Sequence, residues 1–342
     1  MTQVLPSDPE GIEVAARCLR DGGVVGMPTE TVYGLAAVFT DAAAVARVFA
    51  VKERPLFDPL IVHVDHPESI GEVIDPSALG PRARTHLDAL VAAFWPGPLT
   101  IVAPRRDRVP DLVTSGLDTV AVRLPAHPVA RALIAAAGAP LVAPSANRFG
   151  RISPTTATDV VHELGGRIPY VVDGGRCTIG VESTVVKLGS DGVVALLRPG
   201  GVPVEQVERV LGARVAPPGP AIEAPGQLVS HYAPRTPCLL APGPIAGLED
   251  SWLGPLPPRV AVLVAAGSPA SAVARLGGAG KEVVASASLS DRGDPEQAAR
   301  VLFSTLRELD RSGADVIVAE PWPDPVGLGR AVQDRLTRAS AR

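Results

Sequence analysis

The stretch that decides the fold is GGVVGMPTETVYGL, residues 22–35. Its two leading glycines end a helix that we predict over residues 10–21, where apolar residues recur at helical spacing. Residues 24–27 then form a short apolar strand, and a polar segment containing Thr29 and Thr31 follows it. In open α/β sheets, ligands bind at strand ends. The two threonines therefore either face a substrate or cap a following helix.

Alternating strands and helices continue on both sides of this stretch. The further elements expected before residue 200 are, in chain order, a helix over 41–52, a strand over 60–64, a helix over 81–94, strands over 99–103 and 119–123, a helix over 127–137, a strand over 141–143, a helix over 155–164, and strands over 170–172, 183–187 and 194–197. This alternation predicts an α/β fold, but the uneven strand spacing does not fix one strand order.

A second unit follows a segment rich in proline and glycine. Its expected elements are a strand over 259–265, a helix over 270–276, a strand over 282–286, a helix over 294–310, a strand over 315–319 and a helix over 328–338. This βαβαβα order predicts a small parallel sheet. Between the units, Pro217-Pro218-Gly219-Pro220 sustains neither a helix nor a central strand. We therefore divide the chain into a first domain over 1–209, a linker over 210–237 and a small α/β domain over 238–342.

Composition and charge exclude several classes of protein. Hydrophobic residues make up 46% of the 342 residues, too many for a disordered chain. The formal net charge is −4, so no overall excess of positive charge indicates nucleic acid. The three cysteines lack Cys-x-x-Cys spacing, which argues against a disulfide framework and a structural zinc site. Without a signal peptide or a sufficiently long apolar run, we expect a soluble, cytoplasmic protein with no membrane contact.

Several well-known catalytic motifs are absent from the sequence, which has no P-loop and no GxGxxG, HExxH or GxSxG motif. What remains is a set of polar residues beside predicted strands: the cations Lys52, Arg54, Arg123 and Arg198, and the hydroxyl or amide side chains Thr29, Ser145, Asn147 and Ser183. Taken singly, each has a structural explanation in a cap, a turn or a helix dipole. Together they suit a polyanion such as a nucleotide, and a reaction that depends on positioning and electrostatics.

These clusters, in this order, resemble the threonylcarbamoyl-AMP synthase family, the YrdC-like fold. The motifs that carry the resemblance are PTETVYGL (28–35), KERP (52–55), PLIVHV (59–64), WPGPLT (95–100), TVAVRLPAHP (119–128), APSAN (143–147), DGG (173–175), GVEST (180–184) and LLRPG (196–200). The longer, two-domain members of the family also carry a linker with APG and HYAP, here at 224–226 and 231–234. The resemblance therefore spans nearly the whole chain.

The resemblance implies an open, twisted, mixed α/β sheet with a large concave cavity, followed by a small Rossmann-like parallel α/β domain. The first domain would be catalytic, and the linker would act as its lid. The implied reaction joins L-threonine, bicarbonate and ATP into threonylcarbamoyl-AMP and pyrophosphate, with Mg²⁺ as the metal. A partner tRNA threonylcarbamoyl transferase complex would then use the product to modify the adenosine beside the tRNA anticodon.

Site residues carry over from the family by position. The catalytic set would be Lys52, Arg54, Ser145 and Asn147. ATP would be bound by Lys52, Arg54, Thr114, Ser145, Ser153, Arg198 and Tyr232. The threonine pocket would be lined by Thr29, His63, Arg123, Ala143 and Ser183, with Arg123 on the substrate carboxylate. Ser145 and Asn147 would also support Mg²⁺ through the phosphates.

The chain departs from the family pattern in one loop. Asp58 precedes Pro59 where we expect an amide side chain, and the bulky Phe57 stands beside it. An acid at this position would either weaken phosphate binding or join the metal shell.

Two other functions remain open on the sequence. The first domain would bind double-stranded RNA without chemistry if a basic stripe such as Arg105-Arg106-Asp107-Arg108 lay on its surface, although a solvated turn is the simpler interpretation. Weak RNA binding is also compatible with the synthase. Alternatively, the chain would be a carbamoyl-transfer maturation enzyme, but relatives of that kind carry acylphosphatase-like and zinc-binding regions that are missing here.

Overall fold

The computed structural model describes residues 1–220, 222–228 and 231–341, which form two compact α/β units. The first unit comprises Met1–Phe149 and Ser153–Leu228, and the second comprises Gly150–Ile152 and Val229–Arg342. The predicted domain boundaries at 209/210 and 237/238 remain predictions. The 3₁₀ helices are η1 (Pro67–Glu72) and η2 (Pro76–Ala78) in the first unit and η3 (Ile245–Gly247) in the second.

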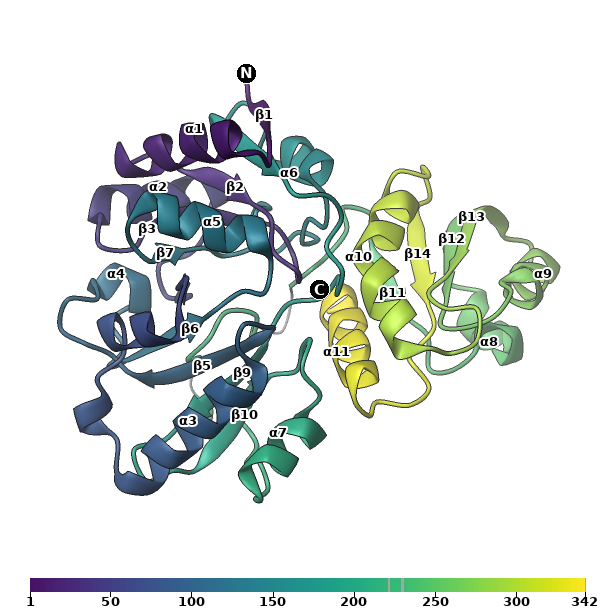
Figure 1. Cartoon of the computed structure of the whole chain (residues 1–342). Coiled ribbons are helices and arrows are strands. Elements are labelled where there is room, and N and C mark those ends of the chain that lie inside the picture. The colour runs from purple at the N-terminus through teal and green to yellow at the C-terminus, as the bar shows by residue number, and fades with distance from the viewer. Residues whose placement is uncertain (221, 229–230, 342) are drawn as a thin grey trace. The chain divides into compact units, whose positions relative to one another are not determined.

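The first unit contains a ten-stranded mixed sheet with helices packed on it (Figure 1). Its strands are β1 (Gln3–Pro6), β2 (Val25–Met27), β3 (Gly34–Val38), β4 (Ile61–His63), β5 (Leu99–Pro104), β6 (Thr119–Arg123), β7 (Leu141–Val142), β8 (Tyr170–Asp173), β9 (Thr184–Leu188) and β10 (Val194–Arg198). Its helices are α1 (Pro9–Arg20), α2 (Ala42–Lys52), α3 (Pro81–Phe94), α4 (Asp111–Thr114), α5 (Pro128–Ala137), α6 (Ala157–Leu164) and α7 (Val204–Leu211).

The strand order is β1-β8-β2-β3-β7-β4-β6-β5-β9-β10. The parallel pairing of β4 with β6 places His63 opposite Arg123, where both strands end. The antiparallel β5 begins beside that same end of β6, and its parallel pairing with β9 places Leu99 opposite Thr184. This mixture of directions brings strand ends and strand beginnings to one edge of the sheet, and polar residues from distant parts of the chain gather there.

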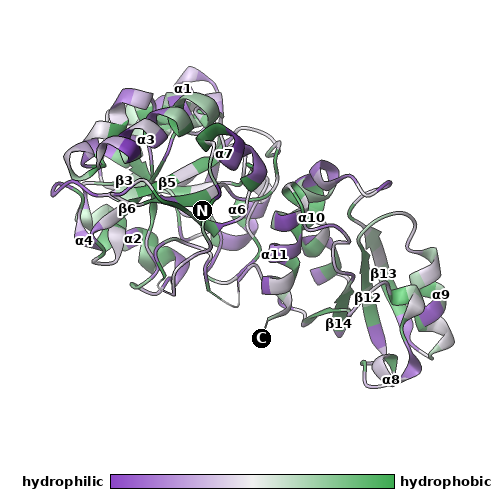
Figure 2. Cartoon of the chain, turned by 90° about the horizontal axis from the view of Figure 1, so that it is seen from below, coloured by the Kyte–Doolittle hydropathy of each residue, from purple (hydrophilic) through white to green (hydrophobic). Residues whose placement is uncertain are grey.

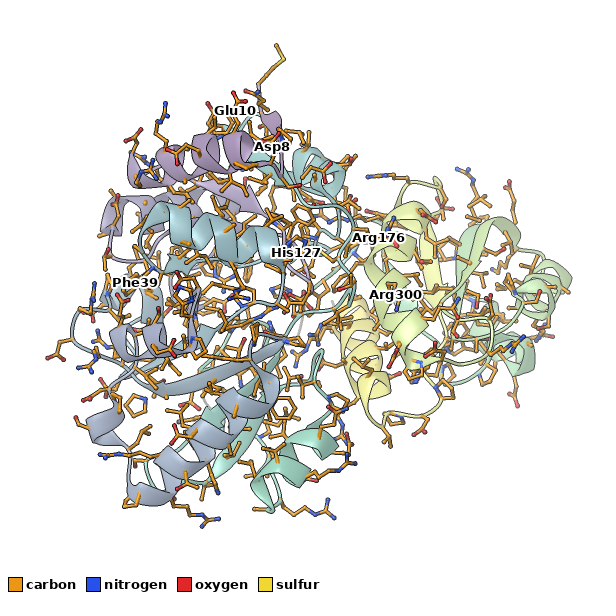
Figure 3. All side chains as sticks on the ribbon, in the orientation of Figure 1. Asp8, Glu10, Phe39, His127, Arg176 and Arg300 are labelled. Carbon is orange, nitrogen blue, oxygen red and sulfur yellow. The ribbon has the colours of Figure 1, made fainter. Side chains whose placement is uncertain are left out.

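Local sequence explains most helix starts. Asp8 caps α1, with Glu10 in its first turn, and His127 caps α5 (Figure 3). Asp41, the first residue of the predicted helix, is the N-cap of α2, and its carboxylate accepts hydrogen bonds from the Ala43 and Ala44 amides.

The strands carry most of the hydrophobic colour, while the outer helix faces are polar (Figure 2). This amphipathic pattern buries the apolar side of each helix against the sheet.

Two local predictions are wrong. The helix expected from residue 155 begins at Ala157, because Thr156 forms a capping box with Asp159. The segment after Thr29 and Thr31 is not helical, since β3 begins at Gly34 and pairs antiparallel with β2. The helix-cap interpretation of these threonines therefore fails. They lie instead in the loop of a hairpin, where the Thr29 hydroxyl accepts the Thr31 and Val32 amides.

The second unit is a small parallel α/β fold, as the βαβαβα pattern predicts. Its strands are β11 (Cys238–Leu240), β12 (Arg259–Val264), β13 (Glu282–Ser288) and β14 (Val316–Ala319), in the all-parallel order β11-β14-β12-β13. Its helices are α8 (Asp250–Leu253), α9 (Ala270–Gly278), α10 (Pro295–Asp310) and α11 (Leu328–Ser340). Strand β11 and helix α8 are additions to the prediction. In the part of the chain described, no helix has both the length and the hydropathy needed to cross a membrane.

Candidate functional site

Arg123 is held at the end of β6 by the loop between β2 and β3. Its guanidinium lies 2.6 Å from Glu30 Oε1 and donates at 2.9 Å to the Thr31 hydroxyl. It also donates to the Gly97 carbonyl at 3.2 Å, and only 3% of the residue is exposed. A buried guanidinium fixed by several partners is rigid and oriented, which suits recognition of a carboxylate.

The electrostatics of this group favour an ionised carboxylate at Glu30. Burial raises the pKa of Glu30, but the charge and hydrogen bond of Arg123 and the amides of Glu30 and Ala126 outweigh it. The pKa therefore lies below its ordinary value of 4.5. Glu30 and Arg123 form an ion pair within the fold, and sequence reasoning had not assigned Glu30 a role.

His63 stands beside Arg123 as a neutral side chain. Burial and the neighbouring charge of Arg123 lower the pKa of His63 to about 3. Its Nδ1 lies 3.2 Å from the Ile61 carbonyl oxygen, which favours the tautomer with a proton on Nδ1. The ring therefore offers no charge near neutral pH, and its role at this site is shape and hydrogen bonding.

Arg198 joins the ends of β9 and β10 to the segment that follows α7. Its guanidinium donates to the carbonyl and hydroxyl oxygens of Ser183, at 2.9 and 3.1 Å, and to the Pro225 carbonyl at 3.0 Å. The Ser183 hydroxyl also lies 2.8 Å from the Thr100 hydroxyl. The structure therefore brings the predicted residues Arg198 and Ser183 together and adds Thr100, which sequence reasoning missed.

Lys52 ends α2 and reaches the loop after β7. Its ammonium donates to the carbonyl oxygens of Ser145 and Asn147, at 2.5 and 2.6 Å. Burial and the charge of Arg54 lower the pKa of Lys52 well below its ordinary value. The structure therefore brings Lys52, Ser145 and Asn147 together, and Lys52 contacts the backbone carbonyls of the two loop residues.

Arg54 contacts other residues of its own loop, between α2 and β4. It forms an ion pair with Asp58, at 2.9 Å between the guanidinium and carboxylate, in which neither side chain is more than 3% exposed. The same guanidinium donates to the Asp58 and Pro59 carbonyls, at 3.0 and 2.8 Å. The acid that departs from the family pattern is thus the ionic partner of a predicted site residue.

The remaining predicted residues occupy varied positions. Ser153 is buried and donates to the carboxylate of Glu182, which sequence reasoning also missed. Ala143 is buried after β7, and its amide donates to the Ile61 carbonyl. Thr114 ends α4 and bonds within its own turn, to the Asp111 carbonyl at 3.4 Å. These positions neither test nor assign ligand contacts, and the predicted roles remain predictions.

Tyr232 belongs to the second unit, where it is buried. Its ring lies 5.6 Å from the Phe303 ring, between centroids, and the Arg335 guanidinium lies 4.8 Å from its centroid. Its backbone takes a positive φ of 63°, which is uncommon for a residue other than glycine. The predicted role of Tyr232 at the nucleotide is not tested by these contacts.

The site offers few ligands for a metal of its own. Ser145 and Asn147 supply neutral oxygen atoms, which Mg²⁺ accepts, but Mg²⁺ sites in proteins usually include one or two carboxylates. Asp58, in the loop between α2 and β4, is paired with Arg54. Among the described residues, no group of three or more His, Cys, Asp or Glu side chains could hold a metal ion. Ser145 and Asn147 would therefore give only supporting contacts to a Mg²⁺ that arrives on a triphosphate.

Fold and site together define a mixed-sheet α/β protein in which several cationic side chains are buried. Residues 17–200 match the domain family of Sua5, YciO and YrdC, described as telomere recombination. Residues 202–341 match the C-terminal domain of threonylcarbamoyl-AMP synthase.

Full-length relatives agree with these matches. Threonylcarbamoyl-AMP synthase of Pyrococcus abyssi is 40% identical over 336 residues, covering 96% of this chain and 94% of the relative. The Bacillus subtilis enzyme of the same name is 38% identical over 353 residues, covering 99% and 96%. The crystal structure of P. abyssi Sua5 complexed with L-threonine superposes with a TM-score of 0.86 at 38% identity, covering 99% of this chain and 98% of that one. The chain belongs to the threonylcarbamoyl-AMP synthase family, and it is an enzyme.

Proposed function

We propose that this chain converts L-threonine, bicarbonate and ATP into threonylcarbamoyl-AMP and pyrophosphate, as a nucleotidyltransferase. The observation that carries the proposal is the division of the buried cations between two groups. Arg123 is fixed between Glu30 and Thr31 next to the neutral His63, whereas Lys52 and Arg54 belong to the segments around α2 and β7. One group suits the carboxylate of an amino acid, and the other suits phosphates.

The reaction needs charge control more than a covalent nucleophile. The threonine nitrogen attacks bicarbonate and water leaves, which gives a carbamate. A carbamate oxygen then attacks the α-phosphorus of ATP, and the bond to the departing pyrophosphate breaks. Because both reactants are anions, cations must offset their repulsion. Arg123 would hold the threonine carboxylate, while Lys52, Arg54 and Arg198 would face the phosphates.

Mg²⁺ would add positive charge to the triphosphate and to the departing pyrophosphate. Ser145 and Asn147 would support it with neutral oxygen atoms. The loop that carries Ser145 and Asn147 must be held in place for this role. The two hydrogen bonds from Lys52 to the backbone carbonyls of these residues hold it.

We further propose that the product passes to a tRNA threonylcarbamoyl transferase in the cytoplasm. The mixed anhydride is labile in water, so a partner that consumes it promptly is expected. Direct RNA binding by the basic stripe receives less support. Arg105 and Arg108 of that stripe form ion pairs with Asp111 and Glu72, at 2.7 and 3.3 Å.

The test is pyrophosphate release from ATP with Mg²⁺ by the full chain. We expect release to require both L-threonine and bicarbonate, with L-serine and L-alanine as poor substitutes. Arg123→Lys should raise the KM for L-threonine by about tenfold or more, because a lysine loses the bidentate geometry. Release that is independent of threonine, or absent from a folded chain that binds ATP, would refute the proposal.

A further inference from the structure

Asp58 is a buried acid in direct contact with Arg54, one of the predicted phosphate-binding cations. Its carboxylate lies 2.9 Å from the Arg54 guanidinium, and the side chain is fully buried. Burial raises the pKa of Asp58 above its ordinary value, and the charges of Arg54, Lys52 and Arg198 reduce that shift. These three cations come from the loop after α2, from α2 itself and from the end of β10. The carboxylate therefore contacts Arg54 and lies within the electrostatic influence of two further cations, Lys52 and Arg198.

The ion pair is not needed to satisfy the whole Arg54 side chain. Its guanidinium also donates to the backbone carbonyls of Asp58 and Pro59. These two bonds are independent of the charge on the Asp58 side chain, so they would survive its replacement by an amide. What the carboxylate adds is negative charge where buried cations would otherwise repel one another. Lys52 illustrates this repulsion, because the charge of Arg54 lowers its pKa and that of Asp58 raises it.

We propose that Asp58 is a resident counter-anion that occupies the electrostatic place of the ATP phosphates and sets the affinity for the nucleotide. This inference rests on the proposed function, since it assumes that ATP binds at these cations. Without ATP, the carboxylate compensates the buried positive charge. When the triphosphate arrives, it must share Arg54 with Asp58 and is repelled by it. Asp58 therefore limits affinity for phosphate and leaves the threonine group around Arg123 unaffected.

The test compares the full-length wild-type chain with Asp58→Asn by calorimetric titration with MgATP, inorganic pyrophosphate and L-threonine. We expect the Kd for MgATP and for pyrophosphate to fall about tenfold in the variant, with the Kd for L-threonine unchanged. A purely structural role for Asp58 would weaken phosphate binding instead. Glu53→Gln is the matched control, because it removes one negative charge from an exposed side chain of the same loop that pairs with Arg167. It should leave all three affinities within about twofold.

The outcomes separate this inference from the proposed function. A wild-type chain that binds neither MgATP nor pyrophosphate refutes the proposed function. A wild-type chain that binds both, with no tighter binding by the variant, refutes the inference alone. Weakening of MgATP binding without a change for pyrophosphate free of Mg²⁺ also refutes it, because Asp58 would then be a metal ligand. If Asp58→Asn does not fold, Asp58→Ser makes the same charge change with a smaller side chain, and the same expectations apply.

Discussion

His63 has an ionisable side chain, but its surroundings keep that side chain uncharged. It is 3% exposed and faces Arg123 across the β4–β6 pair. Both burial and the neighbouring guanidinium disfavour the imidazolium. A histidine in this position is a neutral imidazole near neutral pH, so it can form hydrogen bonds but cannot act as a general acid.

His63 should make folding stability depend on pH. Its pKa is about 3 in the folded chain against 6.5 ordinarily, so below pH 6.5 only the unfolded chain takes up the proton. Stability is therefore present above pH 6.5 and is lost as the pH falls toward 3. Between pH 6.5 and 5, His63 should cost about 2 kcal/mol of unfolding free energy, and His63→Gln should remove that slope. Urea unfolding at several pH values measures this, with the exposed His66→Gln as control, and an unchanged slope in His63→Gln would contradict it.

The Glu30–Arg123 ion pair should also lose its contribution to stability as the pH falls, but in a lower pH range than His63. Because the folded pKa of Glu30 lies below 4.5, its contribution is present above pH 4.5 and is lost as the pH falls through the folded value. At pH 7, Glu30→Gln should lower the unfolding free energy by about 3 kcal/mol, since it leaves Arg123 buried without its partner. The difference from wild type should narrow below pH 4.5. The exposed pair of Glu53 and Arg167 offers a control, in which Glu53→Gln should change stability by less than about 1 kcal/mol. Equal effects of the two variants would contradict this account.

At the scale of elements, hydrophobic periodicity predicted the bounds of several helices and strands. The helix over 81–94 and the strand over 119–123 have the predicted bounds. Strand β3 was missed because GLAAV is small and apolar, without the alternation of a half-buried strand. Strand β1 was missed because its pairing with β8 joins residues about 170 positions apart, which no local pattern contains.

The turn after β10 should tolerate no side chain at Gly200. A Cβ there would lie 2.3 Å from the Ser183 carbonyl carbon and 2.4 Å from the Glu182 oxygen. Gly200→Ala should therefore push apart the β9 and β10 ends and loosen the contact of Arg198 with Ser183. We expect a loss of about 2 kcal/mol or more in unfolding free energy. Gly219→Ala is the control, since nothing lies within 4 Å of its Cβ, and it should stay within about 0.5 kcal/mol. Equal stability of the two variants would show that the turn adapts.

At the scale of the whole molecule, the sequence and the family resemblance predicted candidate site residues, and the structure brings some of them into contact, such as Lys52 with Ser145 and Arg198 with Ser183. The sequence and the resemblance missed the partners that orient these residues, such as Glu30, Thr100 and Glu182. These residues are ordinary polar residues in sequence, and only the pairing of distant strands brings them to Arg123, Ser183 and Ser153. The linker was likewise predicted as a break in the pattern, yet its first half has definite contacts with the first unit.

Residues 213–220 and 222–228 belong to the first unit and should contribute to its stability. Ala216 exchanges backbone hydrogen bonds with the β10 residues Val194 and Leu196, and Glu223 forms an ion pair with Lys187. Ala224 is fully buried among Ile61, Val102, Ala121, Val185 and Leu197. A chain ending at 228 keeps these contacts, whereas a chain ending at 209 loses them and also cuts α7.

Thermal unfolding of two truncated chains tests this contribution. We expect residues 1–228 to unfold in one cooperative transition, and residues 1–209 to lose about 3 kcal/mol, or roughly 6–12 °C in Tm for a unit of this size. Within the longer chain, Ala224→Asp should lower the Tm in the same direction, because it buries an unpaired charge in the apolar cluster. Glu223→Gln should cost less, since Lys187 is partly exposed. Equal Tm values for the two truncated chains would contradict a contribution of the first half of the linker to stability.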